Sequence, residues 1–179
     1  MQTRFVKVLA GAMVSLPLLA VPVFSADSGG SSSGDEPKCD NGLVYNKKTK
    51  KCEPPKAGMI DDDSLYSAGR ALAMDGKYDE AIKVLTLAQD KTDPRILNYL
   101  GYSHRKAGRV LVGLGYYQEA LRNNPDYTLV REYMGEAHLM LGDVAAARLQ
   151  LSEIEKRCGK GCREYGMLEE QIDAYLRAG

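Results

Sequence analysis

The sequence lacks net charge, and this absence excludes a large class of function. Its 24 lysine and arginine residues are balanced by 24 aspartate and glutamate residues. Proteins that bind nucleic acid need an excess of positive charge to attract the phosphates. We therefore expect no nucleic acid among the partners of this chain.

Catalytic motifs are lacking as well. The sequence contains no phosphate-binding loop, no Ser-His-Asp set, no paired-carboxylate cleft and no haem-attachment motif. No further cysteine or histidine lies near a cysteine pair at the spacing of metal ligands. We expect a protein that is not an enzyme and that holds no metal or cofactor.

Long apolar runs are absent except at the N-terminus. Two cations precede an apolar run of 17 residues (8–24), and the small residues Ser25 and Ala26 follow it. This layout is typical of a secretory signal peptide over residues 1–26, cleaved near Ser25 or Ala26. A retained membrane anchor is the alternative, although the run is at the lower limit for crossing a bilayer. We expect a periplasmic or secreted protein with no membrane span once the signal is removed.

Residues 27–38 contain glycine, serine and charged side chains but no apolar residue, which predicts a disordered tether.

The four cysteines follow as two local pairs. In an exported chain an even number of cysteines indicates disulfides, because the compartment beyond the membrane is oxidising.

The first pair, Cys39 and Cys52, brackets a short β-prone run and a polar turn. We predict a disulfide-stapled β-hairpin over residues 39–52, in which the bond replaces the core that so small a segment lacks. The string Cys39, Gly42, Tyr45, Asn46, Thr49 and Cys52 also resembles one hairpin of the peritrophin-type chitin-binding module. That resemblance implies an alternative function, binding of a cell-wall polymer or glycan, and with it a weak contact with an envelope polymer.

The second pair, Cys158 and Cys162, encloses three residues. We predict a structural disulfide here, with a thiol redox pair and half of a metal site as the alternatives. A redox pair of the thioredoxin type has two residues between its cysteines and lies in a βαβ unit, and neither feature is present.

An internal repeat begins at residue 62. Three glycines recur with periods of 32 and 34 residues, and each is followed seven residues later by a second glycine: Gly69 and Gly76, Gly101 and Gly108, Gly135 and Gly142. A period in this range indicates a solenoid. Apolar residues between the glycines follow the spacing of amphipathic helices. The second glycine of each pair is expected to end the first helix in a left-handed turn.

The strings LYSAGRALAMDGKYDEAIKVLTLA, LNYLGYSHRKAGRVLVGLGYYQEALRNNP and REYMGEAHLMLGDVAAARLQLSEI resemble tetratricopeptide repeats. The resemblance implies an all-α fold, a short α-solenoid of three helix pairs in residues 62–93, 94–127 and 128–159. Residues 53–61 would link the hairpin to it. The helical pattern of residues 162–177 predicts a capping helix, which an open repeat stack needs.

The resemblance also implies a function, since tetratricopeptide stacks bind proteins or peptides in a groove lined by their first helices. We therefore expect a non-enzymatic scaffold of the bacterial periplasm whose partner is another protein or peptide. The predicted groove residues lie on first helices outside the apolar stripe, and they are rich in the tyrosine and arginine that dominate binding surfaces: Tyr66, Arg70, Arg95, Asn98, Tyr99, Tyr102, Arg105, Glu132, Tyr133 and Glu136.

Overall fold

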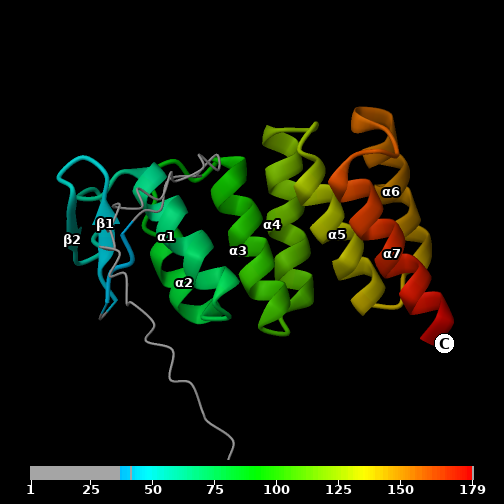
Figure 1. The fold of residues 1–179 in the computed structure, drawn as a ribbon, viewed down its shortest axis with the longest axis horizontal. Coiled ribbons are helices and arrows are strands. Elements are labelled where there is room, and N and C mark those ends of the chain that lie inside the picture. Colours follow the sequence, from blue (N-terminus) through cyan, green and yellow to red (C-terminus); the bar gives the residue numbers. More distant parts are fainter. Residues whose placement is uncertain (1–36, 41, 179) are drawn as a thin grey trace, which may run out of the picture. The chain divides into compact units, whose positions relative to one another are not determined.

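A computed structural model describes residues 37–40 and 42–178. The predicted signal peptide (1–26) and all but the last two residues of the predicted tether (27–38) lie outside this range. Within it, a two-stranded hairpin is followed by seven helices that lie side by side in the stack (Figure 1). The all-α fold with a preceding hairpin is confirmed.

The hairpin consists of β1 (Val44–Asn46) and β2 (Lys51–Glu53), paired antiparallel with Tyr45 opposite Cys52. The predicted disulfide between Cys39 and Cys52 is confirmed. The Asn46 side chain holds the turn, because its oxygen accepts hydrogen bonds from the backbone N–H groups of Lys48 (3.0 Å) and Thr49 (3.3 Å).

The hairpin packs against the first helix and closes that end of the stack. Val44 from β1 and Ile60 from the linker are buried in the same apolar cluster as Leu65. The backbone N–H of Lys47 donates to Ser64 Oγ at 2.9 Å. The hairpin is thus part of the repeat structure, and its inner face supplies core that the first helix pair needs.

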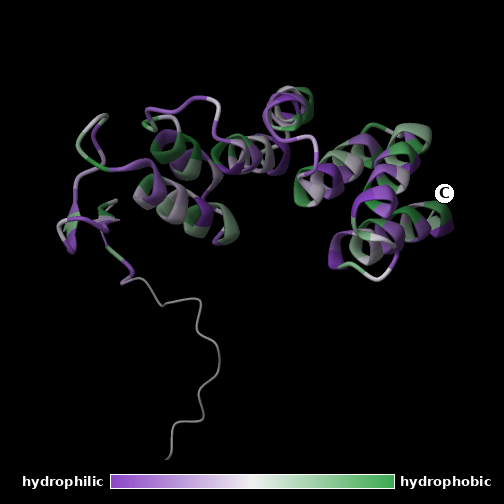
Figure 2. Cartoon of the chain, turned by 90° about the horizontal axis from the view of Figure 1, so that it is seen from above, coloured by the Kyte–Doolittle hydropathy of each residue, from purple (hydrophilic) through white to green (hydrophobic). Residues whose placement is uncertain are grey.

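The helices form pairs joined by short turns. The first pair is α1 (Asp62–Met74) and α2 (Tyr78–Leu85), the second is α3 (Pro94–Lys106) and α4 (Val110–Asn123), and the third is α5 (Thr128–Met140) and α6 (Val144–Cys158). A last helix, α7 (Arg163–Ala178), follows where a cap was predicted. Hydrophobic and hydrophilic residues are mixed along the helices (Figure 2).

The turn glycines behave as their spacing predicts. Gly76, Gly108 and Gly142 all have positive φ, between 77° and 83°. In each turn the residue after the glycine donates its backbone N–H to a carbonyl five residues earlier, as Lys77 does to Leu72 at 2.9 Å. This pattern ends the first helix of every pair in the same way.

The mid-helix glycines allow close packing, but not always with the same neighbour. A Cβ on Gly69 would lie 2.4 Å from Leu85 of α2, and one on Gly101 would lie 2.6 Å from Tyr117 of α4. A Cβ on Gly135 would instead lie 2.5 Å from Leu168 of α7. The repeat pattern predicts contact with the paired helix in all three units, so the third contact differs from the expectation.

That contact shows how α7 fits into the stack. The first helices touch one another in the order α1, α3 and α5, and α7 continues the series by packing on both α5 and α6. It therefore occupies the place that the first helix of a fourth pair would take. No helix among the described residues combines the length and the apolar character needed to cross a bilayer.

Candidate functional site

All ten predicted groove residues lie on the first helices α1, α3 and α5. On α3, Asn98, Tyr102 and Arg105 follow one another at intervals of three or four residues, which places them on one face. We call the surface formed by α1, α3, α5 and α7 the first-helix face.

Between α1 and α3 the charged groups are paired. Arg95 Nη2 lies 2.8 Å from Asp63 Oδ1 and 2.6 Å from Asp93 Oδ2, and the Arg95 guanidinium lies 5.0 Å from the centre of the Tyr66 ring. Arg70 Nε donates to the Tyr99 hydroxyl at 3.0 Å. Both arginines in this half of the face therefore have partners within the protein.

Between α3 and α5 the central group is Arg105, whose side chain is only 4% exposed. Its Nη1 lies 2.5 Å from Glu136 Oε2, and its Nε donates to the Tyr117 hydroxyl at 3.3 Å. Among the described residues nothing accepts a hydrogen bond from Arg105 Nη2, although that atom is buried. A buried donor without an acceptor costs about 1–3 kcal/mol, and its burial keeps this nitrogen out of contact with a ligand on the surface.

Tyrosine rings connect the three helices. Tyr66 lies against Tyr99 with ring centres 5.8 Å apart, and Tyr102 lies against Tyr133 at 5.0 Å. The Arg105 guanidinium lies 5.4 Å from the Tyr102 ring and 5.5 Å from the Tyr133 ring. Burial raises the pKa of Tyr133 far above its usual value, which keeps its hydroxyl protonated. These rings form a preformed aromatic surface of the kind that anchors binding partners.

Two predicted residues lie deeper than a groove surface. Asn98 on α3 and Glu132 on α5 occupy equivalent places in successive units, and both are fully buried. Within the described part of the chain, Asn98 has no hydrogen-bond partner, and Glu132 has none while its carboxyl is ionised. Burial, followed by the nearby Glu136 carboxylate, raises the pKa of Glu132 to about 8, so this carboxyl is largely protonated at neutral pH.

The ten predicted residues thus form one connected set but differ in burial. Tyr99 and Arg105 are as buried as core residues, at 3% exposure each, whereas Arg70 and Arg95 are exposed. Arginine and tyrosine spacing located the face. It could not distinguish side chains that lie on its surface from those that support it.

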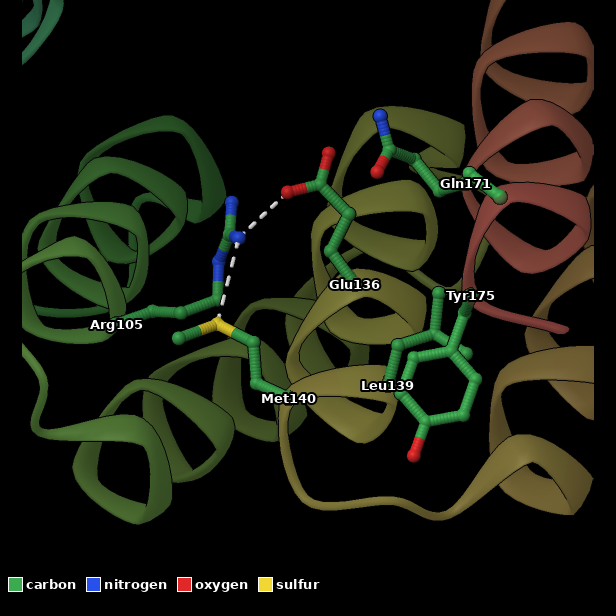
Figure 3. Close-up of a pocket in the computed structure, with 7 residues that line it drawn as sticks. Arg105, Glu136, Leu139, Met140, Gln171 and Tyr175 are labelled. Atoms are coloured by element: carbon green, nitrogen blue, oxygen red, sulfur yellow. Dashed lines mark hydrogen bonds and ion pairs between the residues drawn. The ribbon is translucent and has the colours of Figure 1, made fainter. Parts of the chain in front are cut away.

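A cavity of about 440 Å³ opens beside Arg105, between α3, α5 and α7. Arg105 reaches it from α3, Glu136, Leu139 and Met140 from α5, and Gln171 and Tyr175 from α7 (Figure 3). Ala174 completes the lining.

Five of the lining residues were not among the predicted groove residues. Leu139 and Met140 lie on α5 outside the predicted set, and Gln171, Ala174 and Tyr175 lie on the helix that was predicted only as a cap. They could have been found from the sequence, because a helix that follows the third pair takes the place of the first helix of a fourth pair. Its inner side then faces the same groove.

The cysteines near α7 were also considered as a metal or redox site. The structure joins Cys158 to Cys162, and ligand atoms of these two residues and Glu164 lie within 4.8 Å of one another. Sulfur in a disulfide is not a thiolate, and the thiolate is the form that binds metal. The Cys158–Cys162 disulfide therefore joins the end of α6 to the residue before α7, and in this oxidised state its sulfurs are not metal ligands.

Over residues 100–160 the sequence matches the family model described as tetratricopeptide repeat. No curated protein sequence matches the chain. Several solved structures match it. The chaperone SycD of Yersinia enterocolitica is 24% identical to this chain with a TM-score of 0.55, and the match covers 65% of this chain and 89% of SycD.

Two further structures show the same likeness. PcrH of Pseudomonas aeruginosa is 24% identical with a TM-score of 0.55, covering 68% of this chain and 95% of PcrH. The first repeat domain of human RPAP3 is 21% identical with a TM-score of 0.57, covering 64% of this chain and 91% of that domain. The helices of this protein therefore have the tetratricopeptide repeat fold.

Proposed function

We propose that this protein is an exported, non-enzymatic scaffold of the bacterial periplasm that binds a partner protein or peptide on its first-helix face. The observation that carries the proposal is the face itself, where tyrosine rings and arginines from three helices are held in place by one another. Rigid aromatic and arginine side chains are the groups that contribute most to binding at protein interfaces.

The structural neighbours support a peptide or protein as the ligand class. SycD has been solved with a peptide of the translocator YopD, PcrH with the chaperone binding region of PopB, and the first repeat domain of Spaghetti (RPAP3) with an HSP90 peptide. We infer by analogy that the same face binds the partner here.

Two features support export. The N-terminal sequence has the layout of a signal peptide, and all cysteines of the described residues are in disulfides. We expect the protein in the periplasmic fraction, with a mature N-terminus after Ser25 or Ala26 when it is examined by mass spectrometry. A cytoplasmic protein that keeps residues 1–26 would contradict the location.

Binding is tested by charge reversal on opposite sides of the stack. Arg70→Glu alters the first-helix face, and Arg148→Glu makes the same change at an exposed position of the second helix α6. We expect a partner that co-purifies with the wild-type protein to be lost with Arg70→Glu and retained with Arg148→Glu. The opposite result, or retention with both, would overturn the proposed binding face.

A further inference from the structure

The charge of the protein is divided unevenly along the chain, although the total is zero. Residues 37–56, which include the hairpin, contain six lysines and two acidic residues, whereas residues 57–178 contain 16 basic and 19 acidic residues. The hairpin segment is therefore positive, and the helices carry a small excess of negative charge. A field of one sign confined to one segment attracts anions to that segment alone.

Three of these lysines are exposed at the tip of the hairpin, at one end of the stack (Figure 1). Lys48 and Lys50 lie in the turn between β1 and β2, and Lys51 begins β2. Within the described residues none of the three forms an ion pair. The preceding Lys47 instead donates from Nζ to Ser67 Oγ at 2.8 Å. We call Lys48, Lys50 and Lys51 the hairpin lysines.

The carboxylates beside the tip are engaged in hydrogen bonds of the fold. Glu53 accepts from Thr49 Oγ1 at 2.6 Å and from Asn46 Nδ2 at 2.8 Å. Asp61 accepts from both the backbone N–H and the hydroxyl of Ser64, each at 2.9 Å. These carboxylates hold the turn and the start of α1, and they leave the ammonium groups of the hairpin lysines exposed to solvent.

Lys50 has a backbone conformation that lysine rarely adopts. Among the described residues it is the one non-glycine residue with a positive φ, at 59°. Glycine is the usual residue in this left-handed region, because a Cβ there comes too close to the backbone. A side chain at such a position costs stability, which indicates that it serves a function. What this side chain adds at the tip is an exposed positive charge.

The type of cation favours a charged surface over a single bound anion. Residues 37–56 contain no arginine, whose planar guanidinium is the group that holds one phosphate or carboxylate through two bonds. Lysine is a flexible point charge, and clusters of lysine bind the headgroups of anionic lipids without a fixed geometry. The hairpin lysines are therefore suited to a surface that carries many separate anions.

The position of the hairpin in the sequence favours a membrane as that surface. The apolar run of the predicted leader ends at residue 24, and the hairpin begins at Cys39. A flexible chain of about 14 residues spans about 20 Å, so a leader in the membrane keeps the hairpin close to the lipid headgroups. We propose that the hairpin lysines bind a membrane surface containing anionic phospholipids, independently of the partner on the first-helix face.

The test measures how the purified protein binds to lipid vesicles. One set contains phosphatidylcholine alone, and the other an equimolar mixture of phosphatidylcholine and phosphatidylglycerol. The hairpin variant replaces all three hairpin lysines by glutamine, and the control variant carries Lys77→Gln, Lys83→Gln and Lys106→Gln at exposed positions of the helices. Both variants have the same net charge. The leader, cleaved or retained, is the same in all the proteins compared.

We expect the wild-type protein to prefer the anionic vesicles. Each lysine beside an anionic surface strengthens binding about 5-fold, so the hairpin variant should lose at least about 10-fold of this preference and the control variant less than about 2-fold. The preference should weaken as salt is added, since salt screens exposed charges.

Lys50→Gly separates the charge from the stability of the hairpin. Glycine adopts the left-handed conformation without strain, so this variant should be at least as stable as wild type in urea. It should nevertheless bind the anionic vesicles about 5-fold weaker, because one charge is lost.

Four results would overturn the inference. These are equal binding to the two kinds of vesicle, equal losses in the hairpin and control variants, and unchanged binding of Lys50→Gly. The fourth is tighter binding of soluble polyphosphate than of anionic vesicles at the same phosphate concentration, which would identify an anionic polymer as the ligand.

Discussion

The two ends of the helix stack are covered in different ways. At the N-terminal end, the hairpin closes the first helix pair with Val44 and Ile60, and Arg70 and Arg95 have partners within the protein. At the C-terminal end, α7 packs on α5 and α6 but leaves a cavity, and buried polar atoms of Arg105 and Glu132 lack partners among the described residues. The hairpin end is covered by its own packing, and we call it the complete end; the α7 end keeps a hollow that is open to a partner, and we call it the open end.

The difference follows from what covers each end. The hairpin presents a buried valine and backbone donors to α1, as in the bond from Lys47 to Ser64. Helix α7 presents Leu168 to Gly135 near its start, but Gln171 and Ala174 further along are exposed at the cavity. A repeat helix used as a cap therefore buries one part of the preceding helix and leaves the rest of the groove open.

The largest expected effect comes from the buried cation. We expect Arg105→Met to destabilise the protein by about 3 kcal/mol, because it removes one partner of a largely buried ion pair and the packing on two tyrosine rings. Arg70→Met, at the complete end, should cost under about 0.5 kcal/mol because the side chain is exposed. Urea unfolding of both variants measures the difference. Equal losses would show that the two ends do not differ in this respect.

The disulfides should rank by the length of chain that they close. Cys39 and Cys52 are 13 residues apart, and Cys158 and Cys162 are 4 apart. Replacing the first pair by serine should cost about 3 kcal/mol and replacing the second about 2 kcal/mol in the chain-entropy model. Thermal unfolding of the two double variants tests the order. A larger loss for the shorter loop would mean that the α6–α7 link contributes more than loop closure.

Glu132 makes the open end sensitive to pH. Its folded pKa is about 8 against an ordinary value of 4.5. Between these values the folded protein keeps a proton that the unfolded chain releases, so this group's contribution to stability falls as pH rises and is complete only below 4.5. Relative to wild type, we expect Glu132→Gln to gain about 4 kcal/mol of stability between pH 4.5 and pH 8. A difference that does not change with pH would contradict this ionisation.

The smallest effect is expected for a surface pair at the complete end. Asp63 and Arg95 form an ion pair whose side chains are 63% and 44% exposed. Exposed pairs contribute about 0–1 kcal/mol, and Arg95 keeps Asp93 as a second partner. Asp63→Asn should therefore change the urea midpoint only slightly. A loss of stability above about 1 kcal/mol would show that this pair contributes more than its exposure indicates.

Much of the fold followed from short-range patterns. The turn glycines, Asp93 as the N-cap before Pro94, and the cysteine spacing each depend on a few neighbouring residues, so the sequence indicates them directly. The burial of Asn98 and Glu132 could not be predicted, because it depends on how the neighbouring helices pack against α3 and α5. The cavity likewise depends on where α7 docks, which is set by contacts between residues far apart in the chain.

Position-specific crosslinking in intact cells tests the central claim most directly. A photo-crosslinking residue replaces Gln171 at the cavity in one variant, and Arg148 on α6 in the control. We expect a crosslinked partner from position 171 that is absent from position 148 and is lost when Ala174→Trp is added. Crosslinking from position 148 with none from position 171 would contradict binding on the first-helix face.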